Sequence, residues 1–196
     1  MGAPALARRK KNARRHRALI VFQDESGISQ RPSVRRTWAP RGHTPVLVHA
    51  FNWKKMSLGA ALAYRWDGRQ ARLFFQMKPD SYDTQALIAF LRELRAELRR
   101  QRFILIWDGL PAHKSRQMQK YLHSQRPWIR VERLPGYAPE LNPTESLWGN
   151  IKGRELANFC GESLTAAAIQ CRKGVRRVRR HRNLLFSFLH HAGLSL

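Results

Sequence analysis

The chain has 196 residues, with 37 lysines and arginines against 13 acidic residues, a net charge of +24 and a pI of about 11.6. Its hydrophobic fraction of 43% is enough for a packed core in one domain, or one domain with an arm, and excludes wholesale disorder. The surplus of positive charge indicates a polyanionic partner, nucleic acid before a membrane surface.

The apolar runs and the cysteines set the expected location. The longest apolar runs resemble Phe103–Trp107 and are far too short to span a bilayer, which takes about 20 residues. No apolar stretch of a signal peptide follows the charges of residues 1–17, although an Arg-rich transit peptide remains an alternative. Cys160 and Cys171 match neither a disulfide framework nor a zinc motif, so we expect a reducing, intracellular setting.

Two acid-free basic runs flank the middle of the chain. Residues 1–20 carry seven basic side chains, and residues 172–182 carry seven more. Such runs are commonly solvated faces or unstructured arms. At this density we expect them to contact phosphates, and we expect residues 1–17 to form a basic arm or linker ahead of a domain over residues 18–196.

The hydrophobic pattern predicts the elements in chain order. A strand over Ala18–Gln23 is followed by an irregular connection over Ser26–Thr44 and a turn at Trp66–Gly68. Further strands are expected over Val46–Phe51, Met56–Tyr64, Arg72–Met77, Phe103–Trp107 and Ile129–Leu134. Helices are expected over Asp83–Arg99, Lys114–Leu122, Asn142–Ala157, Ser163–Arg179 and Asn183–His190. A meander of three strands followed by alternating helices and strands indicates an α/β protein with a mixed sheet covered by helices.

Two carboxylates are expected at strand ends. Asp24 and Asp108 each follow an apolar strand, and ligands of open α/β sheets bind outside the carboxyl ends of strands. On neighbouring parallel strands the two acids would converge, and Mg²⁺ favours such oxygen ligands. The simpler alternative is that each carboxylate accepts hydrogen bonds from loop N–H groups.

A third acid opens a predicted helix. In Asn142-Pro143-Thr144-Glu145, the asparagine suits the N-cap, the proline suits the first helical position and Glu145 completes a capping box. Capping alone would explain Glu145, and Glu140 is a neighbouring alternative for a functional acid.

Longer motifs around these acids resemble a known family. The segments are FQDESG at residues 22–27, LIWDGLPAHKS at 105–115 and LPGYAPELNPTESLW at 134–148, with RTWAPRGHTPV at 36–46. Together they resemble DDE transposases of the mariner superfamily, in its bacterial insertion-sequence branch, over residues 18–160. The resemblance implies an RNase H-like fold: an antiparallel three-strand meander plus parallel strands, with helices on both faces.

The resemblance also implies the site and its chemistry. Asp24, Asp108 and Glu145 match the three catalytic acids, with 36 residues between the last two. They would hold two divalent ions, Mg²⁺ or Mn²⁺, on the order of 3.5–4 Å apart, with Asp24 bridging both. The implied activity is DNA strand cleavage and strand transfer without a protein nucleophile. Glu25 and His113 match positions near the metals but are not expected to be primary ligands.

Basic residues near these motifs are expected to contact the DNA backbone. They come from both basic runs and from the helices after Asp108 and Glu145: Arg14, Arg15, Lys114, Arg116, Lys120, Lys152, Arg154, Arg176, Arg177 and Arg180. Trp38, Trp53 and Trp66 are candidates for stacking on bases, whereas Trp107 and Trp148 are expected in the core.

Family members usually carry N-terminal helix-turn-helix domains that read DNA ends, and residues 1–17 are too short and polar to hold one. The sequence therefore suggests a split-gene product or a truncated remnant, in a bacterial cytoplasm and held at the nucleoid through DNA. Expected partners are DNA, divalent metal and either a homodimer partner or a separately encoded helix-turn-helix protein. The rival function is a catalytically idle remnant that regulates by binding DNA.

Overall fold

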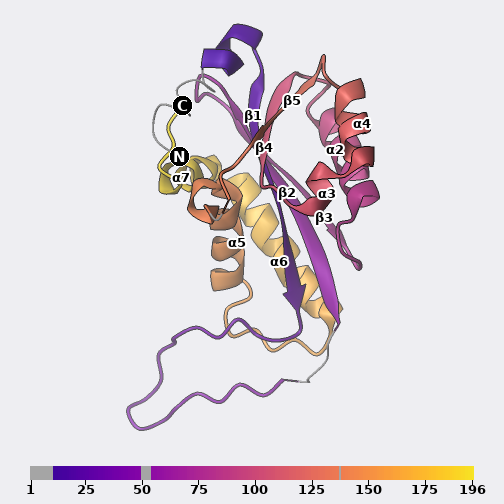
Figure 1. The fold of residues 1–196 in the computed structure, drawn as a ribbon. Coiled ribbons are helices and arrows are strands. Elements are labelled where there is room, and N and C mark those ends of the chain that lie inside the picture. Colours follow the sequence, from indigo (N-terminus) through magenta and orange to yellow (C-terminus); the bar gives the residue numbers. More distant parts are fainter. Residues whose placement is uncertain (1–10, 50–53, 137) are drawn as a thin grey trace.

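A computed structural model describes residues 11–49, 54–136 and 138–196, which form one five-stranded sheet between two layers of helices (Figure 1). The strand order is β3-β2-β1-β4-β5. The strands are β1 (Leu19–Ser29), β2 (Lys55–Arg65), β3 (Ala71–Lys78), β4 (Phe103–Trp107) and β5 (Ile129–Arg133).

The sheet is mixed, as the sequence predicts. β1, β2 and β3 form an antiparallel meander, while β4 pairs parallel to β1 and β5 pairs parallel to β4. The predicted turn between β2 and β3 is present: Gly68 has a φ of +70°, and the Asp67 carboxylate accepts a hydrogen bond from the Arg69 N–H. Since β1 pairs on both sides, it is the central strand of the sheet.

Helices cover both faces, which confirms the predicted α/β fold class. α2 and α4 lie on one face, and α5, α6 and α7 lie on the other (Figure 1). The helices are α2 (Thr84–Glu97), α3 (Pro111–Lys114), α4 (Arg116–Ser124), the 3₁₀ turn η1 (Pro139–Leu141), α5 (Pro143–Arg154), α6 (Leu164–Arg180) and α7 (Arg182–His191). Local capping explains where four of them begin, because the N-cap side chain accepts a backbone N–H at Asp83, Ser115, Asn142 and Ser163.

Alternation along the central strands builds a separate core on each face. Ile20 and Phe22 of β1 pack toward α5–α7, whereas Leu19 and Val21 pack toward α2 and α4. Each strand of the parallel pair is therefore apolar on both faces, which is why β4 is a continuous apolar run.

α5 and α6 are joined by a part-buried ion pair. Arg177 of α6 donates to both carboxylate oxygens of Glu155 and also to the Asn150 side chain. Gly174 allows this approach, because a Cβ there would lie 2.8 Å from a Glu155 oxygen. The Arg177 guanidinium is therefore engaged between the two helices, and its predicted contact with DNA stays a prediction.

Several predicted boundaries are wrong. β1 runs on to Ser29 because Asp24, Glu25 and Ser26 continue the antiparallel ladder with β2, so Asp24 lies within the strand. The predicted strand at Val46–Phe51 is not formed over 46–49, and its last two residues lie outside the described residues. The single helix expected over Lys114–Leu122 is two helices, because Ser115 has extended backbone angles and caps α4.

Two segments extend the fold beyond its sheet. Residues 11–16 are helical and bury Ala13 in the core, while residues 1–10 of the predicted arm lie outside the described residues. Residues 30–49 form a long loop that projects from the end of the sheet (Figure 1). In the part of the chain that the structure describes, no helix has the length and apolar character to cross a membrane.

Candidate active site

The parallel pairing of β1 and β4 brings Asp24 and Asp108 to equivalent positions. The last paired residues are Phe22 and Ile106, so each aspartate lies two residues beyond the same rung. Asp108 directly follows the end of β4, while Asp24 continues on β1 beside β2. By strand alternation both positions share the face covered by α5–α7.

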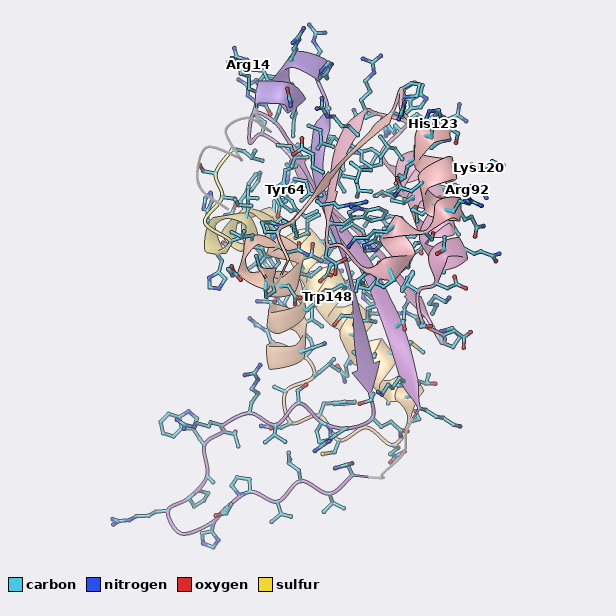
Figure 2. The ribbon with its side chains drawn as sticks, viewed as in Figure 1. Arg14, Tyr64, Arg92, Lys120, His123 and Trp148 are labelled. Carbon is cyan, nitrogen blue, oxygen red and sulfur yellow. The ribbon has the colours of Figure 1, made fainter. Side chains whose placement is uncertain are left out.

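α5 is fixed over this point of β1 by two hydrogen bonds. The Thr144 hydroxyl donates to the Phe22 carbonyl at 3.2 Å, and the Trp148 Nε1–H donates to Asp24 Oδ2 at 2.9 Å. Trp148 points from α5 toward the sheet (Figure 2). The first turn of α5, which carries Glu145, is therefore placed beside the Asp24 carboxylate.

Asp24 is a buried acid in an acidic environment. Its exposed fraction is 8%, and burial raises its pKa to about 8, with further contributions from the carboxylates of Glu145, Glu25 and Asp108. The hydrogen bond from Trp148 acts in the opposite direction but is outweighed. Without a cation the Asp24 carboxyl is therefore mostly protonated at neutral pH, and a cation beside it would favour its charged form.

Glu145 is exposed at the start of α5. Asn142 caps the helix as predicted, with its side chain accepting from the Thr144 N–H, but the Asn142 N–H donates to the Pro139 carbonyl. The Asn142 N–H, which Glu145 would accept in a full capping box, is therefore bonded to a backbone carbonyl, so the predicted box is only half formed. Within the described residues, no hydrogen-bond or ion-pair partner holds the Glu145 carboxylate, which leaves its oxygens available for a ligand.

His113 links Asp108 to Glu25 beneath the site. Its Nδ1 lies 2.8 Å from Asp108 Oδ1, its Nε2 lies 3.3 Å from Glu25 Oε1, and its ring stacks on Trp107 with centroids 4.0 Å apart. Both partners are acceptors, so the ring donates from both nitrogens as an imidazolium. Burial disfavours that charge, but the two carboxylates outweigh it and raise the His113 pKa to about 9.

The hydrogen bonds to Asp108 set its ionisation. Partial burial acts to raise its pKa, but hydrogen bonds from His113 and the Leu110 N–H, with the nearby charge of Lys114, hold the pKa below the usual range. Gly109 gives Lys114 room, because a Cβ there would lie 3.0 Å from the lysine Nζ. Asp108 therefore keeps its negative charge in a part-exposed position, next to a cation.

The donor set fits divalent metal ions. Three carboxylates offer the hard oxygen ligands that Mg²⁺ prefers, and the pKa of Asp24 is raised first by burial and then by the neighbouring acids, both of which a cation would offset. Among the described residues, no three acidic, histidine or cysteine side chains are close enough to form a ready-made metal site.

The predicted DNA contacts lie at varied distances from these acids. Lys114 adjoins Asp108, and Lys152 donates to the Ser26 hydroxyl at 2.7 Å, close to Asp24 along β1. Arg14 covers the ring of Trp66. Exposed side chains elsewhere are Arg15, Arg116, Lys120, Arg154, Arg176 and Arg180.

Of the tryptophans, Trp107 and Trp148 are buried, which confirms the core prediction for both. Trp38 is fully exposed on the projecting loop, while Trp53 lies outside the described residues. The hydrogen bond from Trp148 to Asp24 was not predicted. The available signal was the spacing of three residues from Glu145, which places both side chains on one side of the helix.

A mixed sheet of this order covered by helices on both faces is an RNase H-like fold, and it brings together Asp24 inside β1, Asp108 after β4 and Glu145 at the start of α5. A family model described as DDE superfamily endonuclease matches residues 19–162. The chain therefore belongs to the DDE superfamily endonuclease family. Its predicted place in the bacterial insertion-sequence branch stays a prediction.

Solved structures share the fold. The paired-end complex of Mos1 transposase with the left transposon end has a TM-score of 0.66 at 21% identity, covering 96% of this chain and 56% of that one. The Mos1 strand transfer complex has a TM-score of 0.66 at 22% identity, covering 97% and 54%. The Mos1 transposase catalytic domain with Raltegravir and Mn has a TM-score of 0.56 at 17% identity, covering 98% and 93%.

This chain spans little more than half the length of the two complexed Mos1 chains but nearly all of the isolated catalytic domain. No curated protein gave a significant match.

Proposed function

We propose that the chain is a transposase catalytic domain that cleaves DNA strands and transfers them with divalent metal ions. The observation that carries the proposal is the position of Asp24, a buried carboxylate whose pKa is raised to about 8 by burial and by the surrounding acids. A buried charge of this kind is costly unless a cation or a proton neutralises it. Membership of the DDE superfamily endonuclease family and the fold shared with Mos1 transposase support it.

Asp24, Asp108 and Glu145 would hold two ions, Mg²⁺ or Mn²⁺. When bound, such ions activate a water or a DNA 3′-hydroxyl and neutralise charge on the scissile phosphate. The chain's own residues position the ligands: Trp148 fixes one oxygen of Asp24, and His113 fixes Asp108. Strand transfer, and action as a homodimer on paired DNA ends, belong to the same proposal.

The DNA backbone would be bound by the exposed basic side chains around this centre. Lys114 and Lys152 lie nearest the acids, while α4, α6 and the N-terminal helix supply the predicted contacts farther away. Each phosphate neutralised on duplex DNA contributes about −0.9 to the slope of log affinity against log salt. We leave Arg177 out, because Glu155 and Asn150 occupy its guanidinium.

The test is cleavage of supercoiled DNA and of an RNA–DNA hybrid by the purified chain, with Mg²⁺, with Mn²⁺ and with chelator, beside an Asp108→Asn control. Metal-dependent nicking of DNA that the control lacks is the expected result. DNA binding without cleavage of either substrate would replace the proposal with a DNA-binding regulator. Cleavage confined to the hybrid would make the chain an RNA-cleaving nuclease.

Replacing His113 by Gln should lower the cleavage rate or the apparent Mg²⁺ affinity about 10–100-fold, which is typical of residues that orient metal ligands. The shorter side chain cannot hold Asp108 and Glu25 at once. The measurement is the rate of nicking as a function of Mg²⁺ concentration, with duplex binding in chelator as the check on folding.

Gln117→Ala is the control on the same helix, because that exposed side chain makes no hydrogen bond within the described residues. It should leave the rate within about twofold. A His113→Gln enzyme with wild-type rate and Mg²⁺ dependence would show that the ring is structural.

A further inference from the structure

A deep groove runs along the outer edge of the sheet, between β5, α4 and the start of the chain's described part. Its volume is about 1060 Å³. Its lining combines buried apolar side chains with six exposed basic ones: His16, Arg102, His123, Arg126, Arg130 and Arg133. His123 stands on the outer side of the molecule (Figure 2). Among the described residues that line the groove, none is acidic.

An aromatic ring stands at one end of this groove. Trp128 is 37% exposed, and the Arg95 guanidinium lies 4.9 Å from its ring centroid. Its backbone is fixed, because the Trp128 carbonyl accepts from the Phe103 N–H at the beginning of β4. A second hollow, which also contains Arg17 and Arg100, shares Trp128 and Arg102 with the first. Trp128 therefore stands between two concave, arginine-rich surfaces.

The groove also borders the candidate active site. Trp107 and His113 are among its lining residues, with both side chains buried, and His113 contacts Asp108. From Trp128 the groove follows the five residues of β5, about 16 Å at 3.3 Å per residue. The groove and the carboxylates are therefore neighbours, separated by the buried His113.

We propose that this groove binds a single-stranded segment of DNA, with phosphates on Arg102, Arg126 and Arg130 and a base stacked against Trp128. A basic groove with an aromatic platform is the arrangement by which proteins hold unpaired strands. The groove has about the volume of a small-ligand pocket, roughly 300–1,000 Å³. A few unpaired nucleotides match that size, whereas duplexes bind over broad surfaces of about 1,000–2,500 Å².

The proposal rests on the proposed function for the choice of DNA, because a strand cut at the acids needs a path away from them. Binding itself needs neither metal nor cleavage. It can therefore be measured in chelator, on the full chain, whatever the nuclease test shows.

The experiment is fluorescence anisotropy of a labelled oligothymidylate of about 12 nucleotides, within the range of single-strand site sizes, and of a labelled duplex. The variants are Arg126→Gln/Arg130→Gln and Trp128→Ala, with melting curves as a check on folding. The control is Lys55→Gln/Arg69→Gln, which removes the same charge from exposed sites that do not line the groove.

We expect the arginine pair variant to bind the oligothymidylate about tenfold more weakly and to lose about 1.4 from the salt slope, at 0.7 per phosphate. Trp128→Ala should also lose about tenfold, since one stacked base contributes a comparable factor. Duplex binding should change less than about twofold for both, and the control less than about twofold for either ligand.

Equal losses on duplex and single strand, or equal losses in the control, would overturn the groove assignment. Tighter binding of a labelled oligouridylate than of the oligothymidylate would overturn the choice of DNA. If the wild type nicks DNA but the groove variants bind the oligothymidylate normally, the groove assignment is wrong and the proposed function is supported. If the chain binds single strands selectively but cleaves no DNA, the groove assignment is supported and the proposed function is wrong.

Discussion

Replacing Asp24 by Asn is expected to abolish metal-dependent DNA cleavage and to stabilise the metal-free protein. Losing a carboxylate that holds the charge-neutralising metal ions costs several kcal/mol of transition-state stabilisation, so cleavage should fall at least about 10³-fold. Stability should change in the other direction, because Asn carries no charge to bury among Glu145, Glu25 and Asp108. The Asn carbonyl can still accept the hydrogen bond from Trp148.

The stabilisation should depend on pH. The pKa of Asp24 is about 8 in the folded protein against an ordinary value of 3.8, so as pH rises the unfolded chain loses this proton first. Wild-type stability therefore falls as pH rises between about 4 and 8, at up to about 1.4 kcal/mol per pH unit, and Asn escapes this loss. The advantage of Asp24→Asn should be small near pH 4 and full above pH 8.

Thermal melts at pH 5 and pH 8, with and without Mg²⁺, measure this effect. In chelator at pH 8 the variant should melt at least about 3 °C above wild type, since 1 kcal/mol corresponds to about 2–4 °C for a chain of this size. Mg²⁺ should narrow the difference by stabilising the wild type alone. A variant that melts lower at pH 8, or that still nicks DNA, would contradict the role of Asp24.

Glu145→Gln is expected to remove cleavage without any comparable change in stability. The loss should again reach about 10³-fold or more, because the third carboxylate is gone from the metal-binding set. The side chain is exposed and unpartnered within the described residues, so folding loses only its favourable position at a helix N-terminus, less than about 1 kcal/mol. Asp24→Asn and Glu145→Gln should therefore differ in their effect on protein stability but not in their effect on the cleavage rate.

Glu140→Gln is the matched control, with the same change on the neighbouring exposed acid of η1. It should nick DNA within about twofold of wild type. Nicking assays and melts on the three proteins, with duplex affinity in chelator, separate the outcomes. Loss of cleavage in Glu140→Gln with activity retained in Glu145→Gln would move the third ligand to Glu140.

Much of the fold follows from sequence patterns because each rests on local chemistry. The unbroken apolar run of β4 indicates an inner strand of a parallel pair, and the asparagine-proline pair at 142–143 marks the start of α5. β1 was predicted too short because Asp24, Glu25 and Ser26 look like the end of a strand. Pairing with β2 provides their hydrogen bonds, and no local pattern reveals that partner.

The contacts inside the site depend on residues far apart in the chain. Glu25 and His113 are 88 positions apart, and Trp148 is 124 positions from Asp24. Their motifs place these residues near one another. No sequence spacing predicts that His113 bonds two carboxylates, or that the Trp148 indole N–H bonds Asp24. Trp128 had no motif at all, and its role depends on which strand lies at the sheet edge.

The Arg177–Glu155 ion pair joins α6 to the C-terminal end of α5. α5 carries Glu145 in its first turn, and the ion pair holds the same helix at its C-cap, Glu155. α6 supplies this ion pair, and Arg179 of the same helix also donates to the Leu73 carbonyl of β3. α5 is therefore held to β1 by Thr144 and Trp148 and to α6 by Arg177, so the position of Glu145 depends on the packing of α6 as well as on the central strand.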